Sequence, residues 1–193
     1  FNLLMGLLGG VAVGLALAFL AETLDQSIRT QDDIENKLRQ PFLGSIPQTQ
    51  VRKGRVVDPL LAPEFSLTSE AFRNMRTMVE FAGVESKAGQ LLVTSTVQEE
   101  GKSFIASNLA VTFAQHGETV LLIDGDLRRP KIHKNFHLSA KRGLSDFLAT
   151  GTSTDDLNGL IQDSKISNLK VLVCGTRPPN PSELLTTPRV SAL

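Results

Sequence analysis

The chain has 193 residues, with 20 basic and 20 acidic side chains, so its formal net charge at pH 7 is zero. This balance provides no electrostatic argument for a nucleic-acid partner, and none is expected. The single cysteine, Cys174, excludes a disulfide within the chain and ends an apolar run, so it is expected to be a buried small side chain. The length accommodates one short membrane segment and one globular domain.

Residues 1–21 form an apolar run in which Asn2 is the only polar side chain. At 1.5 Å per residue, a helix of this length covers about 30 Å, the thickness of the hydrocarbon core of a bilayer. The run is therefore predicted to be a transmembrane helix in a lipid bilayer. A cleaved signal peptide is the alternative, because residues 16–18 read Ala-Leu-Ala, but the run has neither an initiating Met nor a basic leader.

Residues 22–63 are expected to be a juxtamembrane segment and linker. Thr30 is suited to cap a short helix that ends before Pro41, and residues 48–63 are polar and bounded by proline, as surface linkers are. These features place a domain boundary before residue 64.

Basic side chains first occur after the apolar run, at Arg29, Lys37 and Arg39. Lysine and arginine next to a membrane span are enriched on the cytoplasmic side. Everything downstream of the span is therefore expected to lie in the cytoplasm.

Residues 64–193 are predicted to form a globular domain of the α/β class. The runs QLLVTS at residues 90–95 and TVLLID at residues 119–124 are continuously apolar and of strand length, as parallel strands buried on both faces are. The helix between them has an apolar stripe and ends near Gly117, which completes a β-α-β unit.

The second half of this domain continues the alternation. A third strand is predicted at residues 169–175, and short helices are predicted at residues 143–151 and 153–161. A further helix starts at Asn180, with Pro181 at its first position and Glu183 placed to close a capping box.

The stretch TSTVQEEGKSF at residues 94–104 carries the first candidate site. Its Gly101, Lys102 and Ser103 lie where a buried strand is followed by a helix, so free N–H groups and the positive end of the helix dipole converge on an anion. In phosphate-binding loops the lysine reaches the terminal phosphates and the serine hydroxyl binds Mg²⁺. A surface turn that merely contains these residues is the alternative. The loop residues expected to bind the nucleotide are Thr96, Glu99, Glu100, Gly101, Lys102, Ser103 and Phe104.

Thr96 departs from the usual phosphate-binding loop, because it occupies the position of the first glycine. It restricts the first bend of the loop but leaves the backbone donors of residues 99–103 in place.

The stretch LLIDGDLRRP places Asp124 and Asp126 at the carboxyl end of the second strand, the end at which ligands of open α/β sheets bind. With Ser103, these two carboxylates are the predicted metal ligands. Asp124 could instead bind the ribose of a dinucleotide, but the glycines of G-x-G-x-x-G are absent. Asp126 and Arg128 could also be turn residues that pair across a loop.

This region also contains a histidine pair and a run of basic residues. His133 and His137 are four residues apart but lack carboxylate or cysteine companions, so no metal site is predicted for them. The basic run RRPKIHKNFHLSAKR at residues 128–142 could face anionic lipid or acidic partner tails, or it could be a solvated loop.

The order of these motifs resembles the bacterial tyrosine kinases that are fused to, or partnered with, polysaccharide co-polymerases. The resemblance extends over the span, ETLDQSIRTQDDIENKLRQPFLGSIP, EAFRNMR, TSTVQEEGKSFIASNLA and VLLIDGDLRRP. It implies a P-loop NTPase-like parallel sheet, with residues 94–104 as Walker A and residues 121–128 as Walker A′. The loop lacks the extra signature lysine of the related cell-division and plasmid-partition ATPases. Walker B and a tyrosine-rich tail are expected beyond Leu193, so the sheet is incomplete and the chain is expected to be a fragment, inactive alone.

The resemblance also implies the chemistry. ATP and Mg²⁺ would be held by Lys102, Ser103, Arg128 and the carboxylates, and phosphate would pass to a tyrosine of a neighbouring subunit. The catalytic residues would be Lys102, Asp124 and Asp126, with Asp124 accepting the tyrosine proton and Asp126 binding the metal. The alternative from another class is a non-catalytic membrane scaffold that binds ATP to control polysaccharide chain length.

The resemblance further implies partners and a location. Glu70, Arg73 and Arg76 match the E-x-x-R-x-x-R motif through which subunits of this family form rings, and they lie opposite the apolar face of a helix at residues 64–82. That face is formed by Phe72, Met75, Val79 and Ala82. Pairs of Glu70 with Arg73 and of Arg76 with Glu80 on a solvated surface are the alternative. The other expected partners are the polysaccharide co-polymerase and the export machinery of the bacterial inner membrane.

Overall fold

The computed structural model describes residues 2–25, 27–28, 30–47, 66–82, 89–150 and 153–192. The chain divides into two compact units, Phe1–Phe42 and Leu43–Leu193, which are described separately. Arg29 and the linker expected at residues 48–63 lie outside the described residues, as does residue 64, where the domain was expected to begin.

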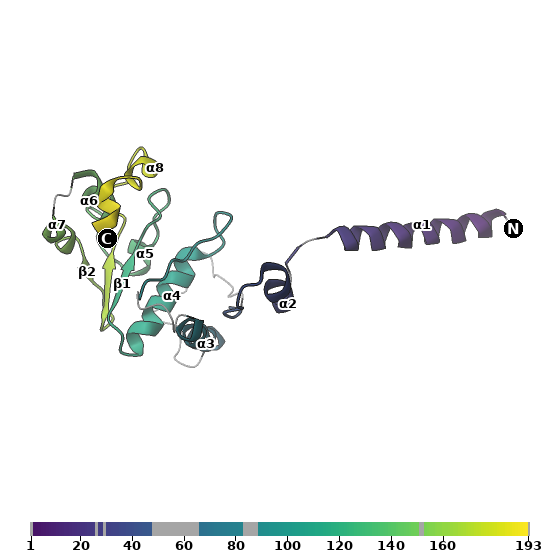
Figure 1. Cartoon of the computed structure of the whole chain (residues 1–193), viewed down its shortest axis with the longest axis horizontal. Coiled ribbons are helices and arrows are strands. Elements are labelled where there is room, and N and C mark those ends of the chain that lie inside the picture. The colour runs from purple at the N-terminus through teal and green to yellow at the C-terminus, as the bar shows by residue number, and fades with distance from the viewer. Residues whose placement is uncertain are drawn as a thin grey trace. The chain divides into compact units, whose positions relative to one another are not determined.

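The first unit consists of a long helix and a short one. Helix α1, Asn2–Leu24, is long and apolar enough to cross a membrane by length and composition (Figure 1). Helix α2, Gln31–Asp33, continues as a π-helical turn, Ile34–Leu38. The Thr30 hydroxyl accepts the N–H of Asp33 at 3.3 Å, and the Asp33 carboxylate accepts the N–H of Thr30 at 3.0 Å. This capping box confirms Thr30 as the cap and fixes where the short helix starts.

The second unit is built on a three-stranded sheet in the order β1-β3-β2 (Figure 1). Its strands are β1, Val120–Ile123, β2, Gln162–Asp163, and β3, Leu169–Leu172. Strand β1 pairs in parallel with β3 from Val120 opposite Leu169 to Ile123 opposite Leu172, whereas β2 is antiparallel to β3. The carboxyl ends of β1 and β3 therefore meet at one edge.

The described part of this unit contains seven helical segments. They are α3, Leu67–Ala82, α4, Lys102–Gln115, α5, Ile132–Asn135, α6, Leu144–Thr150, α7, Thr154–Asn158, α8, Pro181–Leu184, and a final 3-10 helix, Pro188–Ala192. Helix α4 ends as predicted, because Gly117 follows it with a φ of 109° that side chains disfavour.

Strand β3 is buried on both faces near its carboxyl end, because successive residues there point to opposite sides. Val171 and Val173 belong to a core formed with α4 and α5. Leu172 and Cys174 belong to a second core formed with α6 and α7. This alternation has the period of two that a strand imposes, and it confirms the prediction that Cys174 is buried.

Residues 90–95 correct a prediction. They are described but do not pair as a strand, and Leu91 and Leu92 are 54% and 87% exposed. An apolar run becomes a strand only when a neighbour accepts its hydrogen bonds, and no described segment does so here. Strand length and composition were therefore insufficient evidence.

Smaller differences concern single elements. Ala82 is exposed, although it was assigned to the apolar face of α3, because it is the last residue of that helix. Asn180 precedes α8 but makes no capping bond to the backbone, because its side-chain amide donates to Glu183 Oε2 at 3.1 Å. Helix α5 and strand β2 were not predicted, since four and two residues are too short to show a period.

Candidate functional site

The start of α4 is open to an anion. Gly101 precedes the helix with a φ of 93°, and no side chain caps the first turn. The first helical hydrogen bond runs from the N–H of Ile105 to the carbonyl of Gly101 at 2.9 Å, so the N–H groups of the preceding turn remain for a ligand. The helix has fourteen residues, which gives its dipole full effect at this end.

The loop before Gly101 is folded around one of its own carboxylates. Glu100 Oε2 accepts the N–H of Val97 at 3.1 Å, and the Thr96 hydroxyl lies 3.5 Å from both carboxylate oxygens. The Val97 N–H is the main reason that the pKa of Glu100 lies below its ordinary value. Glu100 thus shapes the bend at which Thr96 replaces glycine.

Lys102 and Ser103 occupy the first two positions of α4 and are half-buried. Among the described residues, neither side chain forms an ion pair or a hydrogen bond that would divert it from a ligand. Phe104 differs, because its ring meets that of Phe72 edge to face, with centroids 5.7 Å apart. Its side chain therefore anchors α4 to α3, and only its backbone is available to the nucleotide.

Asp124 lies directly after β1 and is 1% exposed. Its two oxygens accept the N–H of Ile132 at 3.1 Å and the N–H of Asp126 at 3.3 Å. Burial is the largest influence on this carboxyl and raises its pKa, against the opposing effect of the two N–H groups. A carboxylate with a raised pKa is a better proton acceptor than a solvated one.

Asp126 folds the loop that follows β1. Its Oδ1 accepts the N–H of Arg128 at 3.2 Å and the N–H of Arg129 at 2.9 Å. Asp126 thus pairs with the backbone N–H of Arg128 and forms a turn, which agrees with the alternative that both are turn residues. The Arg128 guanidinium is exposed and donates from Nη2 to the Ser182 hydroxyl at 3.2 Å.

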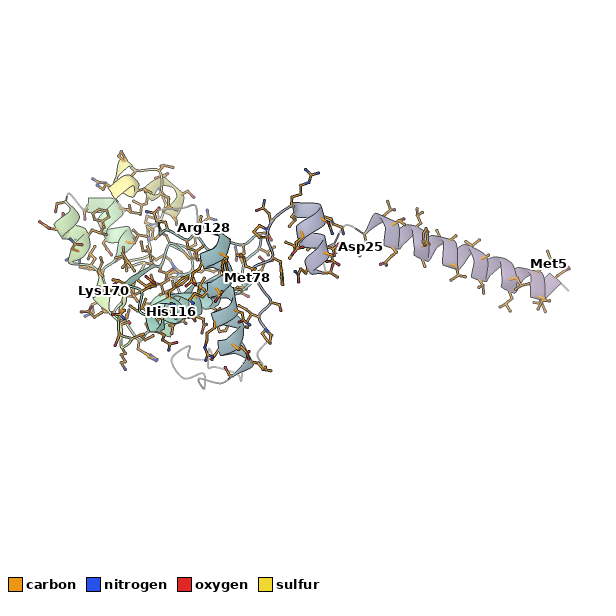
Figure 2. All side chains as sticks on the ribbon, turned by 60° about the horizontal axis from the view of Figure 1, so that its bottom comes forward. Met5, Asp25, Met78, His116, Arg128 and Lys170 are labelled. Atoms are coloured by element: carbon orange, nitrogen blue, oxygen red, sulfur yellow. The ribbon has the colours of Figure 1, made fainter. Side chains whose placement is uncertain are left out.

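One ion pair joins the two candidate loops. Arg129 Nη1 lies 3.7 Å from Glu99 Oε1, which brings the loop after β1 to the loop before α4. No side-chain hydrogen bond or ion pair within the described ranges links Lys102 or Ser103 to the two aspartates. Figure 2 shows Arg128 away from His116, which follows α4, and from Lys170 of β3.

The sequence analysis missed two contributors to this edge. Arg129 was counted only as part of a basic run, and its neighbour Arg128 was preferred because it fits a motif. Ser182 had no signal, because its contact spans 54 positions of sequence. The described residues contain no group of three or more His, Cys, Asp or Glu side chains that could hold a metal ion.

ATP and Mg²⁺ fit the residues present to different degrees. The uncapped turn at Gly101 with Lys102 beside it is a donor set for phosphate. Asp126 is half-buried and close to Asp124, so oxygen ligands for Mg²⁺ are available at this edge. Asp124 itself could reach a ligand only if the loop that covers it opens.

Comparison with known proteins gives consistent results, although no protein-family model matches the chain. The chain is 45% identical over 122 residues to the tyrosine-protein kinase YwqD of Bacillus subtilis, covering 63% of this chain and 50% of that protein. It is 37% identical over 144 residues to the putative tyrosine-protein kinase CapB of Staphylococcus aureus, covering 74% and 62%. It is 33% identical over 194 residues to the tyrosine-protein kinase ptk of Acinetobacter johnsonii, covering 96% and 26%. The chain thus spans about a quarter to three fifths of these relatives.

Solved structures agree in fold. The kinase domain of the Escherichia coli tyrosine kinase ETK matches with a TM-score of 0.75 and 30% identity, covering 86% of this chain and 67% of that one. The BceF tyrosine kinase domain matches with a TM-score of 0.72 and 33% identity, covering 86% and 69%. With the uncapped turn at Gly101 and the aspartate loop after β1, these similarities place the chain in the bacterial tyrosine kinase family.

Proposed function

We propose that the chain forms the nucleotide-binding half of an ATP-dependent protein-tyrosine autokinase of the bacterial inner membrane, acting on polysaccharide polymerisation and export. The observation that carries this proposal is the uncapped start of α4, where Gly101 leaves N–H groups free beside Lys102. The names of the relatives support the choice of tyrosine as the acceptor.

Lys102, Ser103 and the first turn of α4 would bind the β- and γ-phosphates, with Arg128 facing them from the other loop. Mg²⁺, held by Ser103 and Asp126, would neutralise charge on the phosphates during transfer. In such reactions the protein contributes mainly by positioning and by charge stabilisation, so the rigidity of both loops matters more than any covalent step.

Asp124 would accept the proton of the tyrosine hydroxyl. At the same time the tyrosine oxygen would form a bond to the γ-phosphorus, and the bond between that phosphorus and the leaving ADP would break. The raised pKa of Asp124 suits its role as proton acceptor. Asp124 is buried, and its Oδ2 accepts the N–H of Ile132. The loop at residues 125–132 therefore has to open when the tyrosine enters.

Helix α1 would anchor the chain as a membrane span, with Lys37 and Arg39 holding the second unit in the cytoplasm. A polysaccharide co-polymerase is the proposed membrane partner. One matched structure is of a chimeric protein named CapA2B2, which supports a close association between two such proteins.

Subunits would assemble into a ring through α3. Glu70 and Arg73 are exposed. Arg76 is less accessible, because its side chain is 15% exposed and its Nε lies 3.3 Å from Glu80 Oε1. Arg76 would therefore join a ring contact only by leaving Glu80.

The test is Lys102→Met, which removes the phosphate-binding cation and keeps most of the side-chain length. Binding of a fluorescent ATP analogue with Mg²⁺ to the chain in detergent should weaken about tenfold to a hundredfold, the value of a charged hydrogen bond. When the same substitution is made in a longer protein that phosphorylates an added tyrosine polymer, the rate of phosphate transfer should fall by orders of magnitude.

Lys170→Met is the matched control, because Lys170 is an exposed lysine of β3 that lies away from Arg128 (Figure 2). It should bind the analogue as the wild type does. Equal binding by Lys102→Met and the wild type would refute the site. Tight binding with no transfer in the complete assembled protein would favour the scaffold.

A further inference from the structure

Two loops are locked together at the carboxyl end of β3. The N–H of Leu144 donates to the carbonyl of Val173 at 2.9 Å, and the N–H of Ser145 donates to the carbonyl of Cys174 at 2.8 Å. A Cβ atom on Gly143 would lie 2.1 Å from the oxygen of Val173, and one on Gly175 would lie 2.4 Å from the nitrogen of Gly143. The spacing of the two backbones is therefore fixed, since neither glycine can carry a side chain without a shift.

Asp146, in the first turn of α6, joins these loops through one oxygen. Its Oδ2 accepts the N–H of Gly143 at 2.8 Å and the N–H of Thr176 at 3.1 Å. Ser145 Oγ donates to the carbonyl of Thr176, and Thr176 Oγ1 donates to the carbonyl of Lys141 at 3.2 Å. Thr176 is thus held at its N–H, its carbonyl and its hydroxyl, all by residues 141–146.

The segment that leaves Thr176 leads to the candidate site and contains three prolines. Pro178, Pro179 and Pro181 each fix the φ angle of their residue, which limits the freedom of the backbone between Thr176 and α8. Ser182 of α8 accepts the N–H of Arg128 Nη2 at 3.2 Å. Leu184 of the same helix packs against the core that contains Leu148 of α6, which ties the far end of the segment down as well.

We propose that Asp146 is a positioning residue for Arg128, acting through Thr176 and Ser182. A guanidinium has five donors in a rigid fork, so a hydroxyl that accepts one of them sets the direction of the others. The proposal rests on the proposed function, because the value of a fixed Arg128 lies in binding phosphate at the carboxyl edge of the sheet.

The experiment compares Asp146→Ala, Asp146→Asn and Ser182→Ala with the wild-type chain. Asp146→Asn keeps an acceptor oxygen and should behave nearly as the wild type does. The two alanine variants should weaken binding of the fluorescent Mg·ATP analogue about three- to tenfold, the cost of ordering one long side chain. The double variant should lose no more than either single one, and neither change should matter in an Arg128→Ala background.

A second readout does not depend on nucleotide. The side-chain N–H resonances of Arg128 in NMR spectra should show faster rotation in Ser182→Ala and Asp146→Ala than in the wild type. Asp155→Ala, at an exposed aspartate in the first turn of α7, is the matched control and should change neither readout. Asp146→Ser takes the place of Asp146→Ala if the latter does not fold.

Unchanged Arg128 dynamics in the Asp146 and Ser182 variants, with intact Mg·ATP binding by the wild type, would overturn the positioning role and leave the proposed function standing. Faster Arg128 rotation in these variants, together with a wild-type chain that binds no Mg·ATP, would support the positioning role and refute the proposed function. Equal losses in Asp146→Asn and Asp146→Ala would also overturn the role, because the acceptor oxygen would then be irrelevant.

Discussion

The two halves of the candidate site are built differently. The half before α4, residues 89–101, is largely exposed, and its apolar run pairs with no described strand. The half after β1, residues 120–132, begins on a paired strand and contains a carboxylate that is almost fully buried. The first half presents its groups to solvent, whereas the second encloses Asp124 beneath its own loop.

This difference means that substitutions in the two halves should affect different properties, namely nucleotide binding in the first half and the stability of the fold in the second. Groups that meet a phosphate have to be accessible, so the first half can change its side chains at little cost to the fold. The second half belongs to the core of the sheet, and a change there is expected to affect folding and function together. Each of the following predictions tests one side of this division.

The largest expected effect distinguishes two leucines. Leu122 of β1 is 8% exposed, and Leu122→Ala should reduce the free energy of unfolding by about 2–5 kcal/mol. Leu92→Ala, at a leucine that is 87% exposed, should stay within about 0.5 kcal/mol. Hydrogen exchange of the β3 amides in the chain measures both. If Leu92→Ala reduced the free energy of unfolding as much as Leu122→Ala does, the first half would be packed as tightly as the second, and the two halves would not differ in stability.

The same contrast shows what the sequence could predict. The strand at residues 119–124, the end of α4 and the burial of Cys174 followed from local pattern, because each depends on neighbours in the chain. The pairing of strands depends instead on residues far away in the sequence. Residues 90–95 therefore have the composition of a strand but do not form one. The contact between Arg128 and Ser182 was also out of reach, because it depends on a distant turn that brings α8 to the loop.

The second prediction concerns two carboxyls whose pKa values shift in opposite directions. Burial raises the pKa of Asp124 above 3.8, so the folded chain holds this proton more tightly than the unfolded chain does. The stability that Asp124 contributes is therefore greatest at low pH and falls as the pH rises through its folded pKa. The N–H of Val97 lowers the pKa of Glu100 below 4.5, so its contribution is present above 4.5 and is lost as the pH falls through its folded pKa.

Carboxyl ¹³C NMR titration of the chain reads both groups directly. Asp124 should titrate above the ordinary value for aspartate, and Glu100 should titrate below the ordinary value for glutamate. Asp124→Asn should remove the first pH dependence of stability and Glu100→Gln the second. Shifts of the same sign would mean that the two halves do not differ in solvent access as described.

The smallest expected effect concerns Glu99, which has a φ of 68° although it is not glycine. A side chain in the left-handed region costs about 1–2 kcal/mol, partly offset here by the ion pair with Arg129, and exposed pairs contribute only about 0.2–1 kcal/mol. Both Glu99→Gly and Glu99→Ala remove the pair, but only Glu99→Gly removes the Cβ. Glu99→Gly should therefore be more stable than Glu99→Ala by about 1 kcal/mol, measured by hydrogen exchange in the chain. If Glu99→Ala is at least as stable as Glu99→Gly, the left-handed turn is not maintained in solution, and the geometry of the first half is set by the ligand instead.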